Sequence, residues 1–378
     1  MDIMNFKSGK YVSQTGYKSF LPEKINKEWV LNSPEILILL EEATSKVSAL
    51  NAYSLMIPDV DVFIRMHIVK EATTSSKIEG TQTNMEEAVL SRLQVSDEQR
   101  NDWQEVQNYI RAMNFAIKQL DKLPVSNRLF KQTHAILMKG VRGKHKAPGE
   151  FRRSQNWIGG SSLKDATFIP PHHTEVSALM GDLEKFLHNT NINVPHLIRI
   201  AIAHYQFETI HPFLDGNGRL GRLLITLYLV SNNILKKPSL YLSDFFERNR
   251  QHYYDNLTIA RIHNNINQWI KFFLVGVIET ADKSTNAFEA IVKLRENLEG
   301  KKINTLGKRV PLAKKALNYL YVKPVITVND LITELKISKP TANAIVKDFL
   351  QLNILKEQTG FKRNRIFVFE EYMNLFRK

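Results

Sequence analysis

The stretch "HPFLDGNGRLGR" (residues 211–222) decides how the chain around it is built. Apolar residues recur after it with a helical period, at Leu220, Leu223, Leu224, Leu227 and Val230. This spacing predicts a helix that begins near residues 216–218, so that the glycines lie at its N-terminus. Free backbone N–H groups and the positive end of the helix dipole favour an anion there, and glycine lets a phosphate approach closely.

The polar side chains of the same stretch fit a polyphosphate. Arg219 and Arg222 lie on one face of the first helical turns, where the dipole disfavours cations unless an anion is bound. Asp215 is suited to Mg²⁺, which prefers one or two carboxylates plus phosphate oxygens. His211, at the end of the preceding helix, can act as a base near neutral pH. The alternative is a glycine turn in which Asp215 caps a helix and the arginines face water.

Helical periodicity extends outward in both directions from this stretch. It predicts helices over 33–51, 60–80, 100–120, 127–140, 177–189 and 194–210. Residues 155–171 interrupt them with two strand-like runs, which predict a short β-hairpin ended by Pro170 and Pro171. Beyond residue 310, three helices are followed by two strands around Gly360, which is the element order of a winged helix. A helix over 281–299 links this domain to the helical bundle.

Composition narrows the classes of function. The 378 residues contain no cysteine, which excludes disulfides, cysteine zinc sites and thiol nucleophiles. No uncharged apolar run reaches the roughly 18 residues of a membrane helix, so we expect a cytoplasmic protein. The net charge is +14, and residues 300–378 hold 16 Lys and Arg against 6 Asp and Glu, a net of +10. This basic tail indicates a polyanionic partner or a solvated lysine-rich surface.

Residues 211–222 resemble the signature of Fic proteins at all of its fixed positions. The resemblance implies a Fic-type helical bundle that transfers AMP from ATP, with Mg²⁺, to a Ser, Thr or Tyr hydroxyl of a target protein or of itself. His211 would be the catalytic base and Asp215 the metal ligand. The residues implied in nucleotide binding are Phe213, Gly216, Asn217, Gly218, Arg219, Gly221, Arg222, Tyr253 and Tyr254. Asparagine is frequent in the family near the position of Arg261, so the adenine pocket departs from the pattern.

Two further segments have counterparts in the family. The hairpin at 155–171 resembles the flap on which a target protein docks by strand addition. In "SSKIEG", Ser75, Glu79 and Gly80 match an inhibitory motif, and the four-residue spacing places Ser75 and Glu79 on one helix face. The resemblance implies a salt bridge from Glu79 to Arg222 that keeps the γ-phosphate out of its productive pose.

The expected architecture is therefore mainly α with a C-terminal α+β domain. Its parts are an N-terminal helical region with the inhibitory motif (1–95), a Fic core (96–290) and a winged helix (291–378). The alternative function is a DNA-binding regulator whose core removes AMP or transfers another phosphate-bearing group. Its DNA-binding residues would be Lys339, Thr341, Asn343 and Lys347 on a recognition helix and Lys362, Arg363 and Arg365 on the wing. The sequence leaves both a monomer and a homodimer open.

Overall fold

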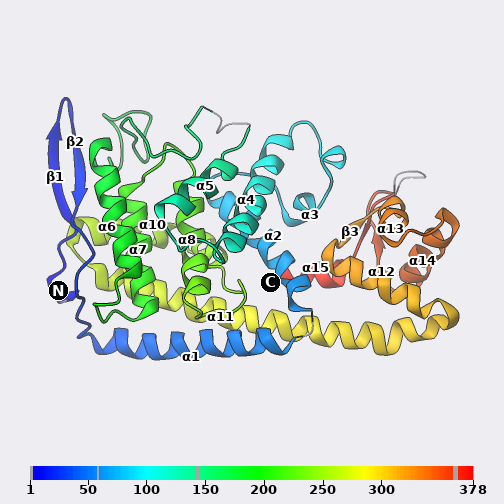
Figure 1. Cartoon of the computed structure of the whole chain (residues 1–378). Helices are drawn as coiled ribbons and strands as arrows, with labels where there is room; N and C mark the ends of the chain where they lie inside the picture. The colour runs from blue at the N-terminus through cyan, green and yellow to red at the C-terminus, as the bar shows by residue number, and fades with distance from the viewer. Residues whose placement is uncertain (1–2, 58, 141–144, 361–364, 378) are drawn as a thin grey trace.

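The computed structural model describes residues 3–57, 59–140, 145–360 and 365–377 of the chain. Helices form most of the fold, and short strands lie at its two ends (Figure 1). The helices between the two long ones described next are α2 (Val60–Ile78), α3 (Met85–Ala88), α4 (Arg100–Gln119), α5 (Asn127–Leu137), α6 (Val176–His188), α7 (His196–Ile210), α8 (Asn217–Ser231), α9 (Ser243–Arg248) and α10 (Arg250–His263).

Two long helices run side by side along one edge of the molecule (Figure 1). They are α1 (Pro34–Met56) and α11 (Ile266–Asn297), and each buries an apolar stripe at helical spacing. The segment 281–299, expected as a separate linking helix, is for the most part the continuation of α11. One continuous helix therefore spans from the bundle to the C-terminal domain.

The central pair α7 and α8 forms the middle of the bundle. Every residue of α7 from Leu197 to Ile210 is buried, including polar ones such as Arg199, His204 and Glu208. The helix α8 begins with Asn217 and is buried as far as Leu229, apart from the half-exposed Gly218. The turn 211–216 that joins the two helices is thus held between two buried elements, and this holds the candidate site in place.

An antiparallel hairpin precedes the helices and was not predicted from the sequence. Its strands are β1 (Gly9–Gln14) and β2 (Tyr17–Pro22), paired from Gly9 with Pro22 to Gln14 with Tyr17. The N–H of Phe20 donates to the carbonyl of Ile169 at 2.9 Å. The N-terminal hairpin thereby joins the segment 155–171, which itself has one antiparallel bridge, between Ile158 and Phe168, in place of two extended strands.

The C-terminal domain has the elements of a winged helix. After the irregular helical segments 298–309 come α12 (Val310–Val322), α13 (Val328–Leu335) and α14 (Lys339–Gln351). The strands β3 (Val325–Ile326), β4 (Lys356–Glu357) and β5 (Phe367–Val368) form a sheet in the order β3-β5-β4. A last helix, α15 (Glu370–Arg377), was not predicted and packs against α2 and α11.

The domain also contacts the bundle through aromatic rings. Phe63 of α2 lies edge-on to Tyr321 at 5.3 Å between ring centroids and 6.5 Å from Tyr372.

Among the described residues, none of the helices combines the length and the apolar character needed to cross a membrane.

Candidate functional site

The turn between α7 and α8 is fixed by its own backbone and by one amide side chain. His211 ends α7 with φ at 50°, and Gly216 precedes α8 with φ at 76°, both in the left-handed region. The N–H of Phe213 donates to Asn217 Oδ1 at 2.8 Å, and Asn217 Nδ2 donates to the carbonyl of Phe213 at 2.9 Å. The buried Asn217 therefore clamps the turn, so that His211 and the start of α8 keep one relative position.

Arg152 holds the backbone at His211. Its guanidinium is buried and donates to the carbonyls of His211 (3.0 Å), Ile210 (3.3 Å) and Pro171 (2.6 Å). Asn156 Nδ2 donates to the carbonyls of His211 at 3.2 Å and Phe213 at 2.9 Å. Arg152 and Asn156 thus tie the two ends of the segment 155–171 to the histidine. Sequence reasoning missed both, because their partners are backbone atoms far along the chain.

The surroundings of His211 keep its ring neutral. Burial lowers the pKa of His211 to about 4, and the positive charges of Arg152 and Arg261 act in the same direction, while the Glu79 carboxylate opposes them. The imidazole is therefore unprotonated at neutral pH and can accept a proton. A bound polyphosphate, being anionic, would raise this pKa toward neutrality.

His134 supports the turn from α5 and was also missed. Its Nδ1 accepts from the N–H of Gly149 at 2.9 Å, which leaves Nε2–H to donate to the carbonyl of Asp215 at 2.9 Å. Its ring stacks on that of Phe213 with centroids 3.8 Å apart. Burial lowers the pKa of His134 to about 4, so this neutral tautomer persists at pH 7. His134 and Phe213 hence position the metal-binding candidate Asp215.

Arg219 lies in the first turn of α8, and its side chain is buried. Its Nη1 is 3.3 Å from Glu105 Oε2, and its Nη2 is 3.6 Å from Asp215 Oδ1. Tyr109 Oη lies 3.3 Å from the carbonyl oxygen of Arg219. Two carboxylates therefore orient the guanidinium, and α4 contributes the additional residues Glu105 and Tyr109 to the site.

Arg222 is held by the motif on α2. Its Nε donates to Ser75 Oγ at 2.9 Å, and its Nη2 donates to the Ser75 carbonyl at 2.9 Å and to Glu79 Oε1 at 2.7 Å. Although burial opposes both effects, the guanidinium lowers the pKa of Glu79 and the carboxylate raises the pKa of Arg222. Both groups are charged at neutral pH. Gly80, with φ at 103°, lets the chain turn away directly after Glu79.

The Glu79 carboxylate occupies the space above the glycine turn. A Cβ atom added to Gly218 would lie 2.3 Å from Glu79 Oε1 and 3.0 Å from Arg222 Nη1. A carboxylate at this point faces the start of α8, where a phosphate group would also bind. The absence of a side chain at Gly218 is thus what allows an anion to approach.

Two other glycines of the stretch allow close packing. A Cβ on Gly216 would lie 2.9 Å from Met138 Sδ, and one on Gly221 would lie 2.2 Å from Glu208 Oε1. Burial raises the pKa of Glu208 to about 7. Gly221 therefore lets α7 and α8 pack closely, and its role in nucleotide binding stays a prediction.

The two tyrosines of α10 differ in accessibility. Tyr253 is fully buried, and its Oη bonds to His204 Nε2 at 2.9 Å, whereas the side chain of Tyr254 is 39% exposed. Both lie close enough to Arg222 and Glu79 to interact with them electrostatically. Tyr254 is the better placed of the two to contact a nucleotide, and the role of each in binding stays a prediction.

A divalent metal fits this site only together with a ligand. Among the described residues no group of three or more His, Cys, Asp or Glu side chains could hold a metal ion. The Asp215 side chain is 42% exposed at the mouth of the turn, so it can offer one carboxylate oxygen. Mg²⁺ is commonly bound by one carboxylate plus phosphate oxygens and water. The residues present therefore fit Mg²⁺ that arrives with a nucleotide.

The candidate DNA-binding residues lie in the winged helix. Lys339, Asn343 and Lys347 are exposed on α14 at intervals of four residues and so share one face, while Thr341 is half-buried. Arg365 pairs with Glu357 across the sheet. Lys362 and Arg363 lie outside the described residues.

Family models match two stretches of the chain. Residues 37–118 match the N-terminal model of the Fic/DOC family, and residues 124–229 match the Fic/DOC family model. The protein adenylyltransferase Fic of Aedes aegypti is 34% identical over 135 residues, which make up 35% of this chain and 24% of that protein. That of Culex quinquefasciatus is 35% identical over the same length, with the same shares. The matches span about a quarter of these curated relatives.

Solved structures show the same fold. A Fic family protein from Desulfovibrio desulfuricans superposes with a TM-score of 0.57 at 20% identity and covers 91% of this chain and 98% of its own. Fic-1 of C. elegans gives a TM-score of 0.52 at 20% identity and covers 69% and 75%. The mainly helical Fic fold with small sheets is thereby confirmed. The two family models contain the motif on α2 and the turn between α7 and α8, and the chain is accordingly a Fic/DOC family protein.

Proposed function

We propose that this chain transfers AMP from ATP to a hydroxyl group of a protein. The hydroxyl oxygen attacks the α-phosphorus, the bond from that phosphorus to the oxygen bridging to the β-phosphate breaks, and pyrophosphate leaves. The hydroxyl proton passes to the neutral ring of His211. Curated relatives named protein adenylyltransferase Fic support this reaction class.

The observation that carries the proposal is the fixed position of His211 beside the start of α8. Asn217 and Arg152 hold the backbone of this turn, so a base and an anion-binding helix end lie within six residues of each other. Phosphoryl chemistry of this kind needs alignment and charge neutralisation more than covalent help. Arg219 and Arg222 supply two cations for the phosphate chain. Mg²⁺ held by Asp215 would add Lewis-acid stabilisation of the phosphate oxygens.

We further propose that Glu79 inhibits this transfer. Its carboxylate lies on Arg222 and over Gly218, where a phosphate would otherwise bind. An ATP molecule would have to share the site with a negative charge, which displaces its γ-phosphate from Arg222. The target protein would dock on the segment 155–171, whose backbone at Ile158 and Phe168 already pairs as a strand.

Incubation with α-labelled ATP tests the base and the donor together. Wild-type protein and His211→Ala are compared, with Arg153→Ala as an exposed control beside the site. We expect label on protein with the wild type and with Arg153→Ala, and at least a hundredfold less with His211→Ala. A mass gain of one AMP supports transfer, and a gain of one phosphate would show a kinase. Removal of AMP from a modified partner, with no incorporation from ATP, would show the reverse reaction.

The winged helix supports binding of duplex DNA as a second function. The exposed face of α14 carries Lys339, Asn343 and Lys347, in the part of the chain with a net charge of +10. Such a face fits a major groove and its phosphates. Binding of a labelled duplex should weaken steeply between 50 and 200 mM salt, and more so for wild type than for Lys339→Ala with Lys347→Ala. A shift that does not depend on salt would contradict this function.

A further inference from the structure

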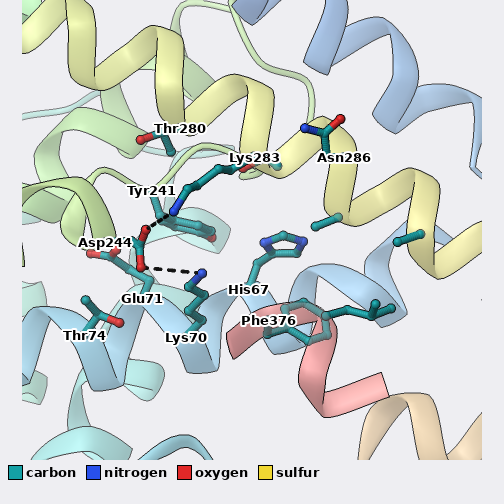
Figure 2. Close-up of a pocket in the computed structure, with 14 residues that line it drawn as sticks. His67, Lys70, Glu71, Thr74, Tyr241, Asp244, Thr280, Lys283, Asn286 and Phe376 are labelled. Carbon is teal, nitrogen blue, oxygen red and sulfur yellow. Dashed lines mark hydrogen bonds and ion pairs between the residues drawn. The ribbon is translucent and has the colours of Figure 1, made fainter. Parts of the chain in front are cut away.

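A pocket separate from the candidate nucleotide site lies along α2 from His67 to Thr74, before the motif residues Ser75 and Glu79. Its volume is about 370 Å³, and it is lined by residues of α2, α9, α11 and α15 (Figure 2). This volume corresponds to about a dozen water molecules at ~30 Å³ each. The pocket is therefore large enough for a small metabolite.

Three buried polar atoms in the lining lack a hydrogen-bond partner among the described residues, and one of them is Tyr241 Oη. His67 Nε2 and Glu71 Oε2 are both buried and both unpartnered in the structure. The other oxygen of Glu71 accepts from Ser243 Oγ and from Tyr109 Oη at 3.1 Å. Buried polar atoms in proteins are nearly always hydrogen-bonded, so these two indicate that a ligand or water completes them. Hydroxyl groups can serve both, because a hydroxyl donates and accepts.

Two lysines of the pocket wall share one carboxylate. Asp244 lies between Lys70, at 3.6 Å, and Lys283, at 3.3 Å, as Figure 2 shows. Arg248 contacts the same carboxylate at 3.2 Å. Burial lowers the pKa of Lys70, and the Asp244 carboxylate only partly opposes this. The lysine would therefore gain from a second anion at the pocket.

The rest of the wall combines polar side chains, such as Thr280 and Asn286, with apolar ones, and α15 of the C-terminal domain forms one side of it. The Phe376 ring of α15 lies 5.1 Å from that of His67, edge-on, and Tyr241 and Ala287 line other sides. A carbon skeleton can pack on these groups while its polar ends reach Lys70 and Glu71. We propose that this pocket binds a small organic anion that carries hydroxyl groups, with its phosphate or carboxylate at Lys70 and its hydroxyls at His67 and Glu71.

The location connects such a ligand to the nucleotide site. Lys70 and Glu71 lie on the same helix as Ser75 and Glu79, and Tyr109 bridges Glu71 to the carbonyl of Arg219. Binding itself is independent of catalysis. If no anion binds in the pocket, the proposed transfer of AMP is unaffected. If the chain does not transfer AMP, the pocket proposal is unaffected.

Calorimetric titration of the full chain tests the proposal. The probes are glycerol 3-phosphate, which carries a phosphate, and gluconate, which carries a carboxylate. Glycerol is the control for the hydroxyl groups alone, and inorganic phosphate is the control for the anionic group alone. We expect at least one anionic probe to bind at least tenfold more tightly than glycerol and than inorganic phosphate. Lys70→Met should weaken it at least tenfold, and Lys77→Met, an exposed lysine on the same helix, by less than twofold.

Two additional variants make the result decisive. Ala287→Phe fills the pocket and leaves its charged side chains in place, so it should abolish binding. This variant tests the site independently of whether Lys70→Met folds. Arg222→Ala should leave probe binding within twofold. The proposal is overturned if neither probe binds more tightly than glycerol, if binding survives Ala287→Phe, or if binding is lost in Arg222→Ala, which would place the probe in the nucleotide site.

Discussion

Glu79 and Arg222 are 143 residues apart in the sequence, yet their side chains meet at 2.7 Å. The contact joins the end of α2 to the second turn of α8. Ser75, one helical turn before Glu79, holds the same guanidinium through both its hydroxyl and its carbonyl. The position of α2 against the bundle thus brings Ser75 and Glu79 onto Arg222.

Glu79→Gln should raise self-modification by α-labelled ATP. The amide keeps the size of the side chain but removes the charge that competes with phosphate, and charge-assisted bonds of this kind contribute about 1.5–3 kcal/mol. We expect incorporation to rise about tenfold or more. Glu247→Gln, which removes an ion pair with Lys77 near the same end of α2, is the matched control and should stay within twofold. Equal or lower incorporation in Glu79→Gln contradicts the inhibitory role.

Gly221→Ala should destabilise the fold, whereas Gly181→Ala should not. A Cβ at Gly221 would lie 2.2 Å from Glu208 Oε1 and 3.0 Å from the Phe207 ring, so α7 and α8 must separate. Overpacking of this kind costs about 1–3 kcal/mol. Gly181, inside α6, has no atom within 4 Å of an added Cβ, and alanine there should stabilise by about 0.5–1 kcal/mol. Urea unfolding of both variants measures the difference, and equal stabilities would contradict the packing argument.

Arg152→Met should reduce transfer more than it reduces ATP binding. The guanidinium positions the His211 backbone by donating hydrogen bonds to buried carbonyls. These hydrogen bonds do not involve Arg219 or Arg222. We expect kcat to fall at least tenfold while the Kd for ATP changes less than threefold. Arg152→Lys should restore part of the rate, because one ammonium can reach some of these carbonyls. A parallel loss of ATP binding would mean that Arg152 supports the whole turn rather than the base.

The free energy of unfolding should increase as the pH rises from 4.5 to 6.5. Burial lowers the pKa of four histidines, to about 3 for His67 and His204 and to about 4 for His134 and His211. The unfolded chain protonates these rings first, so their contribution is lost as the pH falls from 6.5 toward the folded values. Glu71 and Glu208, with pKa values raised to about 7, oppose this between 4.5 and 7.

Four histidines outweigh two glutamates over this range. The free energy of unfolding, measured in urea at pH 5.0, 5.75 and 6.5, should therefore rise with pH. His204→Gln should flatten this slope because it removes a buried ring. The same substitution at the exposed His263 should leave the slope unchanged. A free energy that falls with pH over this range would show that the glutamates dominate.

Much of the fold was predictable because its signals are local. The helices expected over 33–51 and 60–80 correspond to α1 (Pro34–Met56) and α2 (Val60–Ile78), and α8 begins at Asn217, within the window that its apolar period defined. The hairpin β1–β2 and the helix α15 escaped prediction. Each is short, and each is stabilised by packing against distant segments, such as Ile169 or α2.

The sequence by itself determined the glycine-rich start of α8, the histidine ahead of it and the spacing of Ser75 and Glu79, because helix period and glycine act over a few residues. Only the tertiary structure decided that Glu79 lies on Arg222, that Arg152 and His134 hold the turn, and that a charged pocket opens behind α2. Contacts of this kind join residues far apart in the chain. They arise from how the helices pack against one another, and the apolar period of each helix does not specify which helices meet.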